Sequence, residues 1–237
     1  MASGEMTPEE FTKFLETAFI RLVDFSTNGS MHFICMDWRH LRELLDAAAN
    51  PYHELKNLCV WSKTNAGMGS LYRSQHELVF VFKNGSAPHI NNVELGRFGR
   101  NRSNVGNYAG LNTFGNARDT ELAMHPTVKP VALVADAILD CSRRGGIVLD
   151  AFSCSGSLIA AEKTGRRGHG IEIDPHYVDT IIRRFEAVYG LKAVHAESRL
   201  DFAGARGRRS EERKDDPQTK ENAINATQRR RIRGRPR

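Results

Sequence analysis

The feature that most restricts the fold is a regular alternation of helix-type and strand-type segments in the second half of the chain. The pattern predicts a helix over Val131 to Cys141, a strand over Ile147 to Asp150 and a helix over Ser157 to Lys163. A strand over Gly170 to Ile173 and a helix over Pro175 to Tyr189 follow. Such alternation is typical of an α/β fold, in which helices cover both faces of a mainly parallel sheet.

The first half of the chain also contains apolar segments, some with the spacing of a helix and some typical of a strand. Apolar residues at helical spacing follow Pro8 and two acids, so a helix is predicted up to about Leu22. Met31 to Met36 reads as a buried strand, and leucines at positions 41, 44 and 45 predict the next helix. Two more strands are expected over Asn57 to Trp61 and Glu77 to Phe82. From residue 83 to 124 the chain is rich in Gly, Asn, Arg and Ser, and a loop of this length is usually functional or disordered.

Small residues connect a predicted strand to a predicted helix in Val148-Leu-Asp-Ala-Phe-Ser-Cys-Ser-Gly-Ser157. A turn of small residues lets a ligand approach backbone N–H groups at the start of the helix. Glu172 ends the next predicted strand, where a carboxylate can accept hydrogen bonds from both hydroxyls of a ribose. Together these features predict a nucleoside site, and the alternative is a tight connection that binds nothing. The dinucleotide fingerprint Gly-x-Gly-x-x-Gly is absent from this turn.

Several segments resemble a known family in content and in order. They are His125-Pro-Thr-Val-Lys-Pro130, Leu149-Asp-Ala-Phe-Ser-Cys-Ser-Gly156, Leu158-Ile-Ala-Ala-Glu-Lys-Thr-Gly-Arg166 and Gly170-Ile-Glu-Ile-Asp-Pro-His-Tyr177. This series is similar to the C-terminal half of β-class DNA amino-methyltransferases. Trp61-Ser-Lys63 and Arg73-Ser-Gln-His-Glu-Leu78 resemble strands of the same family. The resemblance implies a Rossmann-like, S-adenosylmethionine-dependent methyltransferase domain over residues 1–200, with a target-recognition-like loop region at 84–124.

The resemblance also implies roles for individual residues. The cofactor S-adenosylmethionine would be bound by His125, Thr127, Lys129, Asp150, Phe152, Ser155, Gly156, Ser157 and Glu172. Of these, Lys129 suits the cofactor carboxylate, because a cation and a carboxylate form a charge-assisted hydrogen bond. Double-stranded DNA is the implied partner, with Arg97, Arg100 and Arg102 of the loop region as candidate contacts. The implied reaction is methyl transfer to adenine N6, with cytosine N4 as the close alternative.

Two departures from the family pattern bear on activity. Cys154 stands where the family has the first glycine of its cofactor loop. The catalytic tetrapeptide of the Asp-Pro-Pro-Tyr type is absent from the sequence, and Asp174-Pro-His-Tyr177 is better interpreted as a helix start. This absence suggests that the chain is an N-terminally truncated or inactive copy. No catalytic residue can therefore be assigned from the sequence. A non-catalytic fragment that binds DNA or cofactor, or an RNA methyltransferase, is the alternative function.

Charge is distributed unevenly along the chain. Residues 201–237 hold 12 Lys or Arg and 6 Asp or Glu, which is the whole formal net charge of +6. A basic segment with few apolar residues is predicted to be a disordered arm for a polyanion, or alternatively a solubilising tail. Arg233-Gly-Arg-Pro236 resembles an AT-hook core, in which Arg233, Gly234, Arg235 and Pro236 would enter a narrow A·T-rich minor groove.

The remaining composition favours a cytoplasmic protein without a metal site. The four cysteines form no Cys-x-x-Cys pair, so they indicate neither a zinc site nor a disulfide framework. No stretch of the sequence is long and apolar enough for a membrane span, and the first residues lack the pattern of a signal peptide.

Overall fold

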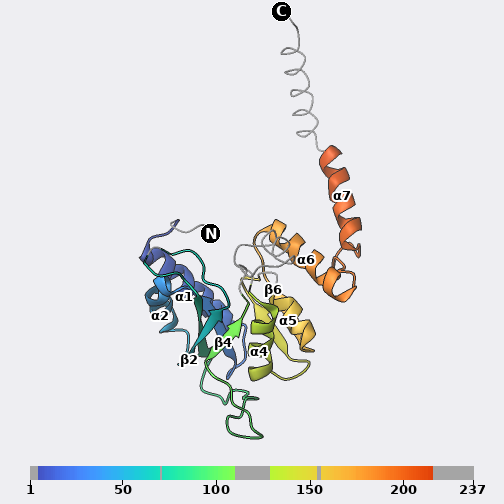
Figure 1. Cartoon of the computed structure of the whole chain (residues 1–237). Helices are drawn as coiled ribbons and strands as arrows, with labels where there is room; N and C mark the ends of the chain where they lie inside the picture. The colour runs from blue at the N-terminus through green and yellow to red at the C-terminus, as the bar shows by residue number, and fades with distance from the viewer. Residues whose placement is uncertain (1–4, 70, 110–128, 154–155, 216–237) are drawn as a thin grey trace, which may run out of the picture. The chain divides into compact units, whose positions relative to one another are not determined.

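The computed structural model describes residues 5–69, 71–109, 129–153 and 156–215. Its helices are α1 (Pro8–Asp24), α2 (Leu41–Ala48), α4 (Val131–Cys141), α5 (Ser157–Lys163), α6 (Pro175–Tyr189) and α7 (Phe202–Asp215), with a 3-10 turn η1 (Trp38–His40) (Figure 1). Its strands are β1 (Met31–Met36), β2 (Glu54–Lys63), β3 (His76–Lys83), β4 (Val105–Tyr108), β5 (Ile147–Asp150) and β6 (Arg167–Gly170). The chain divides into two compact units, residues 1–181 and 182–237.

Helix α1 begins at the predicted position because its N-terminus is capped by side chains. Thr7 Oγ1 accepts a hydrogen bond from the Glu10 backbone N–H at 3.2 Å, and Glu10 Oε2 accepts one from the Thr7 N–H at 2.8 Å. Pro8 occupies the first turn, where its missing N–H costs nothing. The apolar face of α1 buries Leu15 and Phe19 in a cluster that also contains Leu44 of α2. The predicted helix is confirmed.

The larger sheet has the strand order β1-β3-β2-β4. Its central strand, β3, is buried from Leu78 to Phe82, as its continuous apolar run predicts. β3 pairs antiparallel with both β1 and β2, whereas β2 pairs parallel with β4. The α/β fold class is confirmed, but the sheet is mixed where a mainly parallel one is predicted. The reason is that β2 and β3 are joined by a loop without a crossover helix, and such strands pair antiparallel.

The smaller sheet contains the parallel pair β5 and β6. Helices α4 and α5 pack against each other and α5 packs against β6, with Ala135, Ile138, Ala160 and Ala161 buried (Figure 1). The strand predicted over residues 170–173 is wrong in position, because β6 runs from Arg167 to Gly170. Beyond Gly170 the Ile171 N–H still donates to the Asp150 carbonyl, and the chain then turns into α6.

The second unit holds the end of α6 and the basic segment. Val194 and Asp201 form an isolated antiparallel bridge, and α7 follows directly. Residues 202–215 are therefore helical, where the composition predicts disorder. Residues 216–237, with the AT-hook-like end, lie outside the described residues, and the domain boundary at residue 200 stays a prediction. In the described part of the chain no helix has the length and apolar character needed to cross a membrane.

Candidate cofactor site

The candidate site lies at the carboxyl ends of β5 and β6, where Asp150 and Gly170 are paired in register. Asp150 fixes the turn after β5: its Oδ1 accepts from the Phe152 N–H at 3.0 Å and its Oδ2 accepts from the Ser157 hydroxyl. The Ser153 N–H donates to the Ile171 carbonyl at 2.9 Å. The turn is thus held at both ends. In α/β proteins this edge of the sheet is where ligands bind.

Close packing at the ends of β5 and β6 explains why residue 170 is a glycine. A Cβ at Gly170 would lie 2.5 Å from Ser153 Oγ and 2.9 Å from its Cβ, so any larger residue forces one of the two to move. Ser153 is only 1% exposed, and its hydroxyl has no hydrogen-bond partner among the residues that the structure describes. A buried polar atom without a partner is costly, and such atoms often mark a functional position.

Glu172 lies two residues beyond the end of β6, and not at the end of a strand as predicted. It is half-buried, and its Oε1 accepts a hydrogen bond from the Asp174 N–H at 3.0 Å. Asp174 in turn caps α6 by accepting from the His176 N–H at 2.8 Å, which confirms that Asp174-Pro-His-Tyr177 starts a helix. The next side chain, Ile173, is 97% exposed. An acid and an apolar surface therefore lie next to each other at the ligand edge.

Lys129 is brought to the same edge through its backbone. A Cβ at Gly156 would lie 2.9 Å from the Lys129 carbonyl oxygen, so this glycine permits close approach of the two segments. The Lys129 ammonium is 2.7 Å from Glu77 Oε1, and Lys63 Nζ is 3.6 Å from the other oxygen of Glu77. Neither Lys63 nor Glu77 is predicted as a site residue, although both lie in segments that carry the family resemblance.

Phe152, a predicted cofactor residue, connects the turn to the first helix. Its ring meets Phe14 of α1 edge to face at a centroid distance of 6.1 Å, and 51% of the residue stays exposed. The predicted residues Lys129, Asp150, Phe152, Gly156, Ser157 and Glu172 lie within the described part of the chain. The predicted residues His125, Thr127 and Ser155 and the residue Cys154 lie outside it. Their assignment to a cofactor stays a prediction.

The three arginines predicted to contact DNA are all paired with acids of the same chain. Arg97 and Arg100 each lie 3.2 Å from an oxygen of Glu94. Arg102 lies 3.2 Å from Asp136 and 3.0 Å from Asp140 of α4, beside a hollow of about 340 Å³. Their charges are therefore already compensated, and their role in DNA binding stays a prediction.

Burial raises the pKa of two groups near α4. Burial and the hydrogen bond from the Tyr108 hydroxyl to Asp136, at 2.6 Å, raise the pKa of Tyr108 to about 12. Burial raises the pKa of the Cys141 thiol to about 11, which keeps it protonated and unreactive. Within the described ranges no three His, Cys, Asp or Glu residues are grouped so that they could hold a metal ion.

The geometry defines a class of protein: an α/β domain whose candidate ligand edge combines two parallel strands, an acid after the second strand and a lysine at the neighbouring turn. A family model described as DNA methylase, N6_N4_Mtase, matches residues 1–183. The chain therefore belongs to this family of DNA amino-methyltransferases, and the resemblance noted in the sequence is confirmed.

Individual relatives agree with this assignment. The chain is 33% identical over 90 residues to the type II methyltransferase M.ScaI of Streptomyces caespitosus, which covers 38% of this chain and 30% of that protein. It is 43% identical over 67 residues to the DNA adenine methyltransferase YhdJ of Escherichia coli K12, which covers 28% and 23%. The chain thus spans less than a third of the length of these relatives.

Two solved structures share the fold. The M1.HpyAVI complex with S-adenosylmethionine superimposes with a TM-score of 0.60 at 20% identity, over 73% of this chain and 83% of that one. The cytosine-N4-specific PvuII DNA methyltransferase superimposes with a TM-score of 0.62 at 15% identity, over 78% and 74%. At these identities the likeness supports the Rossmann-like α/β fold alone.

Proposed function

We propose that this chain binds S-adenosylmethionine at the β5–β6 edge and serves methyl transfer to an amino group of double-stranded DNA. The observation that carries the proposal is that Asp150 accepts hydrogen bonds from the Phe152 N–H and the Ser157 hydroxyl beside the acid Glu172, in a chain of the DNA methylase family. Access to DNA is consistent with the cytoplasmic location expected from the sequence.

The side chains at this edge fit such a ligand. Glu172 has one carboxylate oxygen bonded to the Asp174 N–H, and its other oxygen accepts no hydrogen bond from the described residues. This leaves an acceptor for ribose hydroxyls. Ile173, next in the chain and exposed, offers an apolar surface to a purine ring. Lys129 supplies a cation for a carboxylate at the opposite end of the ligand.

Each of these residues binds or orients, and none is placed to move a proton. Asp150 holds the Phe152 N–H and the Ser157 hydroxyl, so these two residues are in position before any ligand arrives. S-adenosylmethionine supplies, when bound, a methyl group activated by its attachment to a sulfonium. The residues of the β5–β6 edge would fix where that methyl group points.

Adenine N6 is the proposed acceptor, and cytosine N4 is the alternative. The relative YhdJ is named as an adenine methyltransferase, whereas the PvuII enzyme, which shares the fold, is named as specific for cytosine N4. Both reactions methylate an exocyclic amine, which must be gripped and oriented in a flipped base. Nucleoside mass spectrometry of DNA treated with the active protein would separate N6-methyladenine from N4-methylcytosine.

A second candidate function is a fragment that binds the cofactor or DNA without catalysis. It is favoured by one observation, the absence of an Asp-Pro-Pro-Tyr-type tetrapeptide from these 237 residues. Loss of the orienting group would remove several of the roughly 7–11 kcal/mol that orientation contributes, so we expect no detectable transfer by this polypeptide alone.

The deciding experiment measures transfer of labelled methyl from S-adenosylmethionine to mixed-sequence DNA. The 237-residue chain is compared with a version extended by any in-frame upstream codons. Activity of the extended form alone would agree with the truncation expected from the sequence. Robust activity of the short chain would refute the fragment hypothesis, and binding of S-adenosylmethionine by neither form would refute the proposed function.

A further inference from the structure

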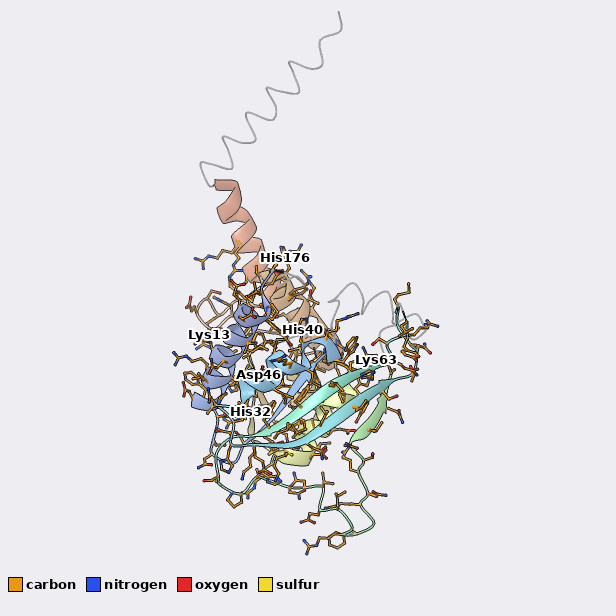
Figure 2. The ribbon with its side chains drawn as sticks, turned by 90° about the vertical axis from the view of Figure 1, so that its left-hand side faces the viewer. Lys13, His32, His40, Asp46, Lys63 and His176 are labelled. Carbon is orange, nitrogen blue, oxygen red and sulfur yellow. The ribbon has the colours of Figure 1, made fainter. Side chains whose placement is uncertain are left out.

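One half-buried carboxylate, Glu77, joins two lysines from distant parts of the chain. Its two oxygens lie 2.7 Å from Lys129 Nζ and 3.6 Å from Lys63 Nζ. The exposed fractions of the three side chains are 17% for Glu77, 22% for Lys129 and 29% for Lys63. Ion pairs at this degree of burial are screened less than surface pairs, so the attraction between their charges is stronger. Figure 2 labels Lys63 on its strand.

The sheet holds Glu77 and Lys63 in fixed positions. Glu77 is paired with Trp61 in the β2–β3 register, and Lys63 Nζ lies 4.7 Å from the centroid of the Trp61 ring. Trp61 is itself 3% exposed, and its indole N–H donates to the Tyr108 carbonyl at 3.0 Å. The Lys63 N–H donates to the Gln75 carbonyl at 2.8 Å. The end of β2 and the start of β3 therefore form a rigid support for the carboxylate.

Lys129 differs from its two partners because it lies on no strand. It precedes α4 by two residues, and its carbonyl lies against Gly156 at the start of α5. A lysine ammonium on a flexible four-carbon stem is poorly positioned unless something holds it. Glu77 forms an ion pair with this ammonium, and Glu77 belongs to the larger sheet. The cluster thus connects the larger sheet to the ligand edge.

We propose that Glu77 and Lys63 are positioning residues for the amino-acid end of S-adenosylmethionine. Glu77 holds the Lys129 ammonium where it meets the ligand carboxylate, and Lys63 shares Glu77 so that the acid does not fully neutralise Lys129. The inference rests on the proposed function, because it assigns part of the same site. It goes beyond the residues predicted from the sequence, since neither Lys63 nor Glu77 was among them.

The proposal makes a prediction for Glu77→Gln and for the charge-conserving Glu77→Asp. S-adenosylmethionine carries a sulfonium, an ammonium and a carboxylate, so by charge alone the loss of an acid should weaken its binding, whereas Glu77→Asp should leave it unchanged. If Glu77 positions Lys129, both substitutions should weaken binding, by about tenfold in Kd for Glu77→Gln, because the Lys129 ammonium loses its contact with Glu77. Weakening by Glu77→Asp therefore separates positioning from simple electrostatics.

Calorimetry with two ligands tests this in the full chain. S-adenosylmethionine has the amino-acid end, and 5′-methylthioadenosine lacks it. We expect Glu77→Gln and Lys63→Met each to weaken the binding of S-adenosylmethionine. Both should leave the affinity for 5′-methylthioadenosine unchanged. The matched control is Glu94→Gln, because Glu94 also joins two cations, Arg97 and Arg100, each at 3.2 Å, but away from the ligand edge. It should change neither affinity.

The outcomes distinguish this inference from the proposed function. If the unaltered chain binds neither ligand, the proposed function fails and the inference fails with it. If the unaltered chain binds both but Glu77→Gln binds S-adenosylmethionine equally or more tightly, the positioning role alone is refuted. Equal weakening of both ligands would also refute it, since that result indicates a general loss of structure. Should Glu77→Gln not fold, Lys63→Met decides by the same comparison.

Discussion

Acid should destabilise the first unit through a half-buried histidine, His32 of β1, labelled in Figure 2. Its Nδ1 lies 2.8 Å from the Tyr52 hydroxyl, and its Nε2 lies 2.9 Å from the Ser26 hydroxyl and 3.2 Å from that of Ser30. Burial lowers the pKa of His32 from 6.5 to about 4 and raises that of Tyr52. The folded protein therefore keeps His32 neutral at a pH where the unfolded chain binds a proton.

The sign and size of the effect follow from this difference in pKa. Because the folded pKa is the lower one, the contribution to stability is complete above pH 6.5 and is lost as the pH falls toward 4. Each pH unit between these values costs about 1.4 kcal/mol, so the total loss is about 3 kcal/mol. That is a large part of the roughly 5–15 kcal/mol that stabilises a typical domain.

The assay is urea unfolding between pH 7.5 and 4.5, followed by the fluorescence of the buried Trp61 in a Trp38→Phe background, since Trp38 is 57% exposed. His32→Gln should be less stable at neutral pH but should lose less stability on acidification than the unaltered chain. The control is His76→Gln, because His76 is exposed. If the pH dependence of His32→Gln matches that of the unaltered chain, the assignment to His32 is wrong.

Three further predictions concern the ligand edge and the basic end. Glu172→Ala should weaken S-adenosylmethionine binding about tenfold or more by calorimetry, because hydrogen bonds to charged groups contribute about 1.5–3 kcal/mol, while Glu162→Ala on α5 should not. Gly170→Ala should lower the free energy of unfolding by about 1–3 kcal/mol through overpacking, and Ser153→Gly in the same chain should restore most of it; no restoration would show that the Ser153 contact is not the cause. Removing residues 216–237, which hold 7 Lys or Arg, should flatten the dependence of DNA affinity on salt, and an unchanged slope would place the phosphate contacts elsewhere.

The elements that the sequence predicts well are those defined by local patterns. Pro8 with Glu9 and Glu10 marks the start of α1, and the apolar run from Leu78 to Phe82 marks the central strand. Strand β4 was missed because Val105-Gly-Asn-Tyr108 is short and polar, and it becomes a strand only through pairing with β2. The displacement of β6 has a similar cause: the alternation in Ile171-Glu-Ile173 resembles a strand, but these residues form the turn that leads into α6.

The candidate site also contains residues that local sequence patterns predict and residues that they do not. The place of Asp150 could be predicted, because it follows the apolar segment from Ile147 to Leu149 at the start of a strand-turn-helix unit, whereas Glu172 lies beyond its strand and not at the predicted strand end. Glu77 lies 52 positions before Lys129, and nothing local relates the two. Their contact exists because the end of the β2–β3 hairpin meets the segment that precedes α4. Contacts between distant segments depend on tertiary packing, which periodicity does not encode.

The arginines of the loop region form ion pairs with acids, so the number of basic residues alone does not predict where DNA binds. Residues 1–200 hold 22 basic and 22 acidic residues, and Arg97, Arg100 and Arg102 all face acids of their own chain. These arginine side chains are exposed and surface ion pairs are weak, so DNA phosphates could compete with Glu94, Asp136 or Asp140 for them. Residues 202–215 carry a net +2 and residues 216–237 a net +5, from 5 basic against 3 acidic and 7 basic against 2 acidic residues. We therefore expect attraction to a polyanion to come mainly from the C-terminal segment and nucleoside binding to depend on the β5–β6 edge, so that truncation separates the two properties.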